Sequence, residues 1–164
     1  KQLVATQDGQ VVKQMPVSLG KPANPSMSGT MVIIERLEKT VFDSSTYGVP
    51  ANSPDGYRTD IQFAERLTWS GQFIHAAPWS VADQGKRNVS HGCTNVSQQN
   101  AIWLYDLTLI GDPYTVKGTP RKLREGDGWT DWDKTWDEYV KGSALPAPAD
   151  AAPSAAPSAS APTN

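Results

Sequence analysis

Cysteine is almost absent from this chain, since only one of its 164 residues, Cys93, is a cysteine. A single cysteine excludes a disulfide within the chain and any zinc site built from several thiolates. It leaves an inert buried thiol or a reactive one. Histidine is scarce as well, with His75 and His91 the two in the chain. What these rare residues could do together is therefore the main question for function.

The chain also lacks a strong excess of charge and a long apolar run. Fifteen basic and seventeen acidic residues give a net charge of −2, which argues against charge-driven binding to nucleic acid or an anionic membrane. The sequence has no run of about eighteen apolar residues, so it predicts no membrane span. Lys1 does not begin a basic-then-apolar leader, and we expect targeting or upstream segments to lie outside this chain.

The last 22 residues, 143–164, have a composition of their own. They contain five Pro and nine Ala, and Leu145 is their one large apolar side chain. This composition predicts a disordered tail, with a partner-binding segment as the alternative. Residues 1–142 hold all six Trp, five Tyr and three Phe, enough for one folded domain with a hydrophobic core.

The first third of the chain is predicted to be β structure. Asp8-Gly9 is typical of a two-residue hairpin turn, and it joins apolar residues at 3–5 to others at 11–17. The β-branched run at 30–35 predicts a strand buried on both faces, and residues 39–45 continue the sheet.

The middle of the chain alternates loops and further strands. Residues 47–57 are rich in Gly, Pro, Asn and Ser, as expected of an exposed flap. Apolar residues at mostly odd spacing over 58–76 predict strands, with a turn or bulge at Ser70-Gly71.

One helix stands out after the cysteine, and a second is predicted near the end of the domain. Ser97 can cap a helix whose apolar positions follow at helical spacing up to 108, and Gly111 can end it. A strand is predicted at 114–117. Aromatic residues at helical spacing over 129–140 predict a short helix that docks on the sheet through them, with a ligand platform as the alternative.

The two histidines and the cysteine lie close together in sequence, within eighteen residues of one another. This clustering favours a nucleophile pair of the Cys–His type. Cys93 follows a polar loop and precedes the helix capped by Ser97, so we expect its thiol near the surface and near a helix N-terminus. Both conditions favour the thiolate.

The neighbours of Cys93 could complete a site for acyl transfer. Gly92 allows a substrate carbonyl to approach closely, so that the amide N–H groups of Gly92 and Cys93 could point at a developing oxyanion. Asn95 could brace the loop, and a main-chain carbonyl is the expected acceptor that orients a histidine. Two alternatives stay open at this point: an inert buried thiol with incidental histidines, and a zinc site made by His75, His91 and Cys93.

The arrangement of these residues resembles a known signature. His75, fourteen further residues and then Ser90-His91-Gly92-Cys93-Thr94-Asn95 is similar to the signature of the L,D-transpeptidase catalytic domain. DSSTYGVP (43–50), GYRTD (56–60) and FIHAAPWS (73–80) resemble its mycobacterial-type branch. The resemblance covers about residues 1–140 and argues strongly against an inert thiol.

The resemblance implies a mostly β fold, a sandwich-like mixed sheet with one or two short helices. It also implies an enzyme without a metal or other cofactor that acts on peptidoglycan outside the cytoplasmic membrane. Cys93 would attack the bond between diaminopimelate and D-Ala of a tetrapeptide stem, and His75 would be its base, held by the carbonyl of Ala76. His91 would shape the loop and assist proton transfer, with the Gly92 and Cys93 amides as the oxyanion site.

The resemblance also implies partners and a substrate cleft. An amine of a second stem would resolve the thioester into a 3→3 cross-link, and carbapenems would inhibit by acylating Cys93. The cleft would be lined by Tyr57, Ser70, Gly71, Trp79, Ser90 and Asn95. Departures from the family pattern at Phe42, Ala76 and Thr94 bear on substrate preference rather than on the chemistry.

Three other functions stay open. The first is a hydrolytic L,D-carboxypeptidase, in which water replaces the acceptor amine. The second is a non-catalytic module that binds peptidoglycan through Tyr57, Trp79 and the flap. The third, a cysteine endopeptidase, fits less well because both histidines here precede the thiol.

Overall fold

Strands dominate the computed structural model, which describes residues 1–54 and 56–144. The chain divides into two units between Asp133 and Lys134. The predicted domain boundary at 142/143 stays a prediction, and all but two residues of the predicted tail lie outside the described residues. The elements, in chain order, are β1 (Gln2–Gln7), β2 (Gln10–Pro16), β3 (Met27–Val32), β4 (Glu35–Asp43), η1 (Ser44–Tyr47), β5 (Arg58–Arg66), β6 (Phe73–Ala76), η2 (Pro78–Ser80), β7 (Thr94–Val96), α1 (Gln98–Leu107), β8 (Pro113–Val116), β9 (Arg121–Lys122), η3 (Thr130–Asp133) and α2 (Trp136–Val140).

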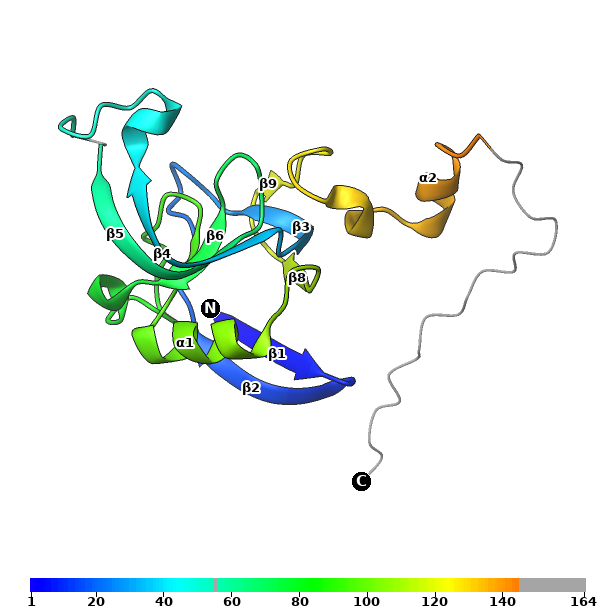
Figure 1. The fold of residues 1–164 in the computed structure, drawn as a ribbon, viewed down its shortest axis with the longest axis horizontal. Coiled ribbons are helices and arrows are strands. Elements are labelled where there is room, and N and C mark those ends of the chain that lie inside the picture. The colour runs from blue at the N-terminus through cyan, green and yellow to red at the C-terminus, as the bar shows by residue number, and fades with distance from the viewer. Residues whose placement is uncertain (55, 145–164) are drawn as a thin grey trace. The chain divides into compact units, whose positions relative to one another are not determined.

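The strands of the first unit form three sheets. β1 pairs with β2, β3 lies between β8 and β9, and β4, β5, β6 and β7 form a four-stranded sheet in that order. Most pairs are antiparallel, while β6 with β7 and β3 with β9 are parallel. Figure 1 shows α1 below β6 and beside the β1–β2 hairpin. This mixed, mostly β fold with a few short helices confirms the predicted fold class.

The local predictions for the hairpin turn, the flap and the start of the first helix are confirmed, but α1 ends at Leu107 with Thr108 as its C-cap and not at Gly111. Asp8 and Gly9 both have positive φ, 52° and 76°, which matches the twist of a tight hairpin. Ser97 caps α1 by accepting a hydrogen bond from Asn100 N at 3.2 Å. The flap between β4 and β5 begins with η1, and the turn after β5 contains Ser70-Gly71.

The strand predicted at 30–35 ends earlier, at Val32, although residues 31–34 are buried as expected. Ile33 N donates to Asp112 O and Ile34 N donates to Arg66 O, so the chain crosses here from the sheet of β3 to the sheet of β4. Ile33 and Ile34 are 2% and 8% exposed. They are buried on all sides because they connect two sheets, not because they form one central strand.

The helix predicted over 129–140 is wrong. Two short helices, η3 and α2, replace it, because Thr135 has an extended backbone and starts α2 with a capping box that includes Glu138. In the first unit, Trp129 and Trp132 are 46% and 65% exposed and do not dock the segment. Asp133 does so instead, since its carboxylate accepts a hydrogen bond from Thr30 N at 2.6 Å.

The β5–β6–β7 region separates the core from the site. Ile74 and Ala76 of β6 pack into the main hydrophobic cluster with Leu104 of α1. Phe73, which alternates with them, packs with Ile61 in a second, smaller cluster. Because side chains alternate along a strand, His75 points to the same side as Phe73, away from the main core.

Glu65 is a buried carboxylate between β4 and α1, 1% exposed. Burial raises its pKa, while the hydroxyl of Thr108 and the charge of Arg36 lower it in part. A raised pKa in the folded state means that protonation favours folding. The contribution of Glu65 to stability is therefore fully present at acidic pH and declines as the pH rises through its folded-state pKa.

We expect Glu65→Gln to remove this decline. Arg36 keeps two partners in the variant, because it also donates to Tyr105 O and lies over the Tyr105 ring at 4.1 Å. Urea unfolding from pH 4 to pH 8 should show that the stability of the wild type, relative to the variant, decreases as the pH rises. Glu38→Gln, an exposed position on the neighbouring strand β4, is the matched control and should show no such trend. A constant difference between wild type and Glu65→Gln would contradict this account.

Candidate active site

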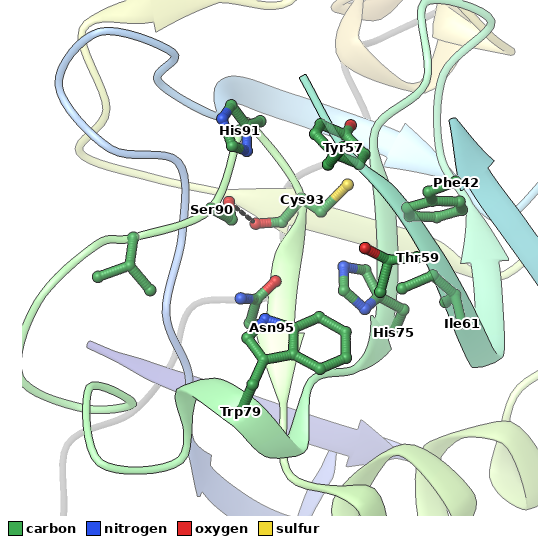
Figure 2. A pocket seen from close by; sticks show the side chains of 11 residues that line it. Phe42, Tyr57, Thr59, Ile61, His75, Trp79, Ser90, His91, Cys93 and Asn95 are labelled. Carbon is green, nitrogen blue, oxygen red and sulfur yellow. Dashed lines mark hydrogen bonds between the residues drawn. The ribbon is translucent and has the colours of Figure 1, made fainter. Parts of the chain in front are cut away.

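A pocket of about 200 Å³ opens on the side of the sheet that carries His75. Its walls come from β4, the end of the flap, β5, β6, η2, β7 and the loop before β7 (Figure 2). The residues that line it are Phe42, Tyr57, Thr59, Ile61, His75, Trp79, Val89, Ser90, His91, Cys93 and Asn95. Of the predicted site residues, Cys93, His75, His91, Tyr57, Trp79, Ser90 and Asn95 thus lie together in one cavity.

The parallel pairing of β6 with β7 brings the rare residues together. His75 is in register with Asn95, so both side chains emerge on the same face. Cys93 lies two residues before Asn95 and joins them in the wall of the pocket. The short strand β7 thereby brings Cys93 next to His75, although seventeen residues lie between them in sequence.

The ring of His75 is held in one tautomer. Its Nδ1 lies 2.8 Å from Ala76 O, and since a carbonyl oxygen can only accept, Nδ1 must carry the hydrogen and Nε2 the lone pair. The ring is 4% exposed and lies between Phe42 and Trp79, with centroid distances of 5.2 and 6.1 Å. Burial lowers the pKa of His75 to about 4, so the imidazole is neutral at pH 7.

The thiol of Cys93 is neutral as well, which corrects the expectation of a thiolate. Burial raises its pKa to about 11, and a backbone hydrogen bond with Phe73 lowers it only in part. Two features explain the difference. β7 separates Cys93 from the start of α1, and the side chain packs against the apolar cluster of Ile61, Ala64 and Phe73. The residue is nevertheless partly accessible, and its Sγ donates to Gly71 O at 3.7 Å.

The loop before Cys93 is fixed by the hydroxyl of Ser90. This hydroxyl donates to Cys93 O at 2.6 Å (Figure 2) and accepts from Gly92 N at 3.1 Å. The amide of Gly92 is therefore engaged within the loop, contrary to the prediction that it points at an oxyanion. Among the described residues, the Cys93 amide has no hydrogen bond that would occupy it in the same way.

His91 lies at the rim of the pocket, with its ring centroid 5.1 Å from that of Tyr57. Lys21 Nζ lies 3.1 Å from His91 Nε2. An ammonium can only donate, so Nε2 is the acceptor of this contact and cannot take a proton from Cys93 while the contact persists. The geometry thus favours His75 over His91 as the proton acceptor.

Ser70 and Gly71 do not line the pocket, although they were predicted to. Ser70 is tied to the buried carboxylate of Asp127 through its amide, at 2.7 Å, and its hydroxyl, at 2.5 Å. This anchor holds the turn in which Gly71 O reaches the sulfur of Cys93. The turn therefore contacts the nucleophile through its backbone.

Thr94, one of the departures from the family pattern, does not line the pocket. Its hydroxyl meets Tyr114 Oη at 2.9 Å, on the opposite face of β7 from Cys93 and Asn95, and it is 2% exposed. Phe42, another of these departures, does line the pocket.

Asn95 presents an unsatisfied acceptor to the pocket. The residue is 3% exposed and its Nδ2 donates to Ser80 Oγ at 3.2 Å. Its Oδ1 is buried without a hydrogen-bond partner among the described residues. Such an atom is costly unless a ligand or water satisfies it.

Several residues of the site were not found from the sequence. Thr59 and Ile61 line the pocket and follow Tyr57 at the alternate spacing of a strand, which was a usable signal. Val89 also lines it. Ser26 and Lys21, which contact Gly92 and His91, come from a distant loop and had no local signal.

No cluster of three or more His, Cys, Asp or Glu residues that could hold a metal ion is found in residues 1–54 and 56–144. Over the same ranges, none of the helices is long and apolar enough to cross a membrane.

Comparison with known proteins places the chain in a family. The profile of the YkuD family, the L,D-transpeptidase catalytic domain, matches residues 1–116. L,D-transpeptidase 2 of Mycobacterium tuberculosis is 47% identical over 145 residues, which are 88% of this chain and 36% of that protein.

Solved structures give the same result. An L,D-transpeptidase from Mycobacterium smegmatis has a TM-score of 0.66 at 46% identity, covering 68% of this chain and 51% of the other. The L,D-transpeptidase LdtMt1 in complex with imipenem has a TM-score of 0.65 at 48% identity, covering 66% and 50%. This chain spans only about a third to a half of these relatives. It belongs to the family of L,D-transpeptidase catalytic domains.

Proposed function

We propose that this domain catalyses L,D-transpeptidation through Cys93. The substrate is the tetrapeptide stem of peptidoglycan, and the scissile bond joins diaminopimelate to the terminal D-Ala. The observation that carries the proposal is the hydrogen bond from His75 Nδ1 to Ala76 O. This hydrogen bond leaves the lone pair of His75 Nε2 free to accept a proton, and both His75 and Cys93 line the pocket.

Acylation begins when the thiol turns from Gly71 O to His75 Nε2. The sulfur attacks the diaminopimelate carbonyl carbon as its proton passes to Nε2. The tetrahedral intermediate then breaks its carbon–nitrogen bond, and the D-Ala nitrogen takes the proton from His75. The products of this half-reaction are a thioester on Cys93 and free D-Ala.

Deacylation reverses these roles with a second stem. The side-chain amine of its diaminopimelate attacks the thioester carbonyl and gives its proton to His75. The Cys93 thiolate leaves and takes that proton back, so the enzyme returns to its neutral resting state. The product is a 3→3 cross-link. Water in place of the amine would make the domain an L,D-carboxypeptidase.

The pocket offers groups that could bind the reacting carbonyl and the stem. The Cys93 N–H is the proposed donor to the oxyanion, since the Gly92 N–H is engaged by Ser90. Asn95 Oδ1, buried and unsatisfied, would accept from an amide N–H of the stem. Tyr57 and the 58% exposed Trp79 provide apolar walls for the peptide.

The apolar walls of the pocket favour a resting state in which both Cys93 and His75 are neutral. Phe42 and Ile61, which line the pocket, lower the local dielectric around the sulfur. Hydrogen bonds to a developing oxyanion are stronger in such surroundings than in water. Because peptidoglycan is the substrate, we also propose an extracytoplasmic location. Carbapenems such as imipenem, bound in the solved relative, are the expected covalent inhibitors.

Product analysis separates these activities. The domain is incubated with a disaccharide-tetrapeptide, and the products are identified by mass spectrometry. Transpeptidation predicts a cross-linked dimer and free D-Ala. A tripeptide with D-Ala but no dimer would assign the domain as a carboxypeptidase. Binding of the substrate without any D-Ala release would favour the non-catalytic module and overturn the proposal.

A further inference from the structure

Ser26 joins a distant loop to the residue that precedes the cysteine. Its hydroxyl accepts a hydrogen bond from Gly20 N at 2.9 Å and donates one to Gly92 O at 2.6 Å. Ser26 is 1% exposed, so water does not replace either contact. The hydroxyl is therefore a fixed bridge between the 20–26 loop and the Gly92–Cys93 peptide.

The loop that carries Ser26 is itself held in place. Asn24 N donates to Lys21 O at 2.8 Å, and Lys21 N donates to Ser90 O at 2.9 Å. The turn is so tight at Gly20 that a Cβ there would lie 2.1 Å from Asn24 O. These contacts give the Ser26 hydroxyl a defined position relative to the loop that ends at Cys93.

The carbonyl that Ser26 holds belongs to the same peptide unit as the Cys93 amide. The described residues contain no cis peptide bond, so Gly92 C=O and Cys93 N–H point in opposite directions from one rigid plane. Gly92 has a φ of 130°, in a region open to glycine, and its lack of a side chain leaves this plane little steric restraint. A short hydrogen bond to the carbonyl is what fixes the plane and therefore the direction of the N–H.

The hydrogen bond also acts on the strength of the amide as a donor. Accepting at the carbonyl polarises a peptide unit and strengthens the bond that its N–H donates. The bridge from Gly20 N–H through Ser26 to Gly92 C=O forms such a chain, with the Cys93 N–H at its end.

We propose that Ser26 is a positioning residue for acylation, whose hydroxyl aims and polarises the Cys93 N–H toward the oxyanion through the Gly92 carbonyl. This inference rests on the proposed function, since it needs an acyl-transfer step at Cys93. Ser26 itself does not line the pocket.

Two reactions of the same thiol test the proposal. Imipenem acylates through a tetrahedral oxyanion, whereas iodoacetamide alkylates sulfur by displacing iodide and forms none. In Ser26→Ala we expect the ratio of the acylation to the alkylation rate constant to fall about 10- to 100-fold, somewhat less than loss of an oxyanion donor costs. The full chain is used, and both rates are measured by intact-mass spectrometry.

Companion variants separate positioning from folding. Ser26→Thr keeps the hydroxyl and should restore most of the ratio. Ser28→Ala is the matched control, because the Ser28 hydroxyl donates to Thr119 O and Arg121 O and not to Gly92. Its ratio should equal that of the wild type.

The remaining outcomes overturn the inference. An unchanged ratio in Ser26→Ala, or acylation and alkylation rates that change together, would leave Ser26 with a structural role only. A Ser26→Thr variant as impaired as Ser26→Ala would do the same. If the wild type itself is not acylated and releases no D-Ala, the proposed function fails and this inference fails with it. Normal wild-type activity with an unchanged ratio overturns this inference alone.

Discussion

Replacing His75 with glutamine should slow acylation of Cys93 by imipenem about 10²- to 10⁴-fold, the usual contribution of a positioned general base. The physical reason is the tautomer. Ala76 O holds the hydrogen of Nδ1, which leaves Nε2 as the group that can take the thiol proton. Glutamine is polar and similar in size, but it has no basic nitrogen. The rate is followed by stopped-flow or by intact-mass spectrometry.

The same substitution at the second histidine is the matched control. His91 Nε2 accepts from Lys21, so His91→Gln should slow acylation far less than His75→Gln. If His91→Gln proves the more damaging variant, the roles assigned to the two histidines are reversed. Thermal unfolding of both variants shows whether the fold is kept.

The resting enzyme should show no thiolate at neutral pH. The pKa of Cys93 is raised to about 11 and that of His75 is lowered to about 4, in both cases mainly by burial. Between these values the thiol keeps its proton and the imidazole has none. Acylation should therefore be almost independent of pH across this range and should fall as the pH drops toward 4, where His75 takes up a proton.

The ultraviolet absorbance of the thiolate measures this state directly. The difference in absorbance between wild type and Cys93→Ser should be absent at pH 7 and should appear as the pH approaches 11. The rate profile alone does not suffice, because a neutral pair and an ion pair can share the same apparent pKa values. Thiolate absorbance at pH 7 that disappears in His75→Gln would show an ion pair and contradict this account.

Much of the site could be predicted because its key residues are few and close in sequence. The spacing of His75, His91 and Cys93 indicated one catalytic cluster, and the loop from Ser90 to Asn95 provides one wall of the pocket. The local signals for the hairpin turn at Asp8-Gly9 and for the cap of α1 at Ser97 were also reliable, since both depend on neighbouring residues.

Features that depend on distant contacts were not predicted. The charge state of Cys93 is determined by the apolar cluster of Ile61, Ala64 and Phe73, which only the folded sheet brings to the sulfur. The engagement of the Gly92 amide by Ser90 is local, but the hydrogen-bonding pattern of a loop cannot be read from its sequence.

At the C-terminal aromatic residues, a feature was predicted that the structure does not have. Helical spacing from Trp129 to Tyr139 suggested a single docked helix, yet Thr135 interrupts it with an extended backbone. η3 docks on β3 through a hydrogen bond from the backbone N–H of Thr30 to the carboxylate of Asp133. A periodic pattern of large side chains was therefore a weaker signal than the capping residue within it.

The most direct test of the central claim is the mass of the protein after brief incubation with a disaccharide-tetrapeptide and an acid quench. We predict that the wild type gains the mass of the substrate less that of D-Ala, on the peptide containing Cys93, and that Cys93→Ser gains none. Release of D-Ala by Cys93→Ser at the wild-type rate, or an adduct on a residue other than Cys93, would contradict the account.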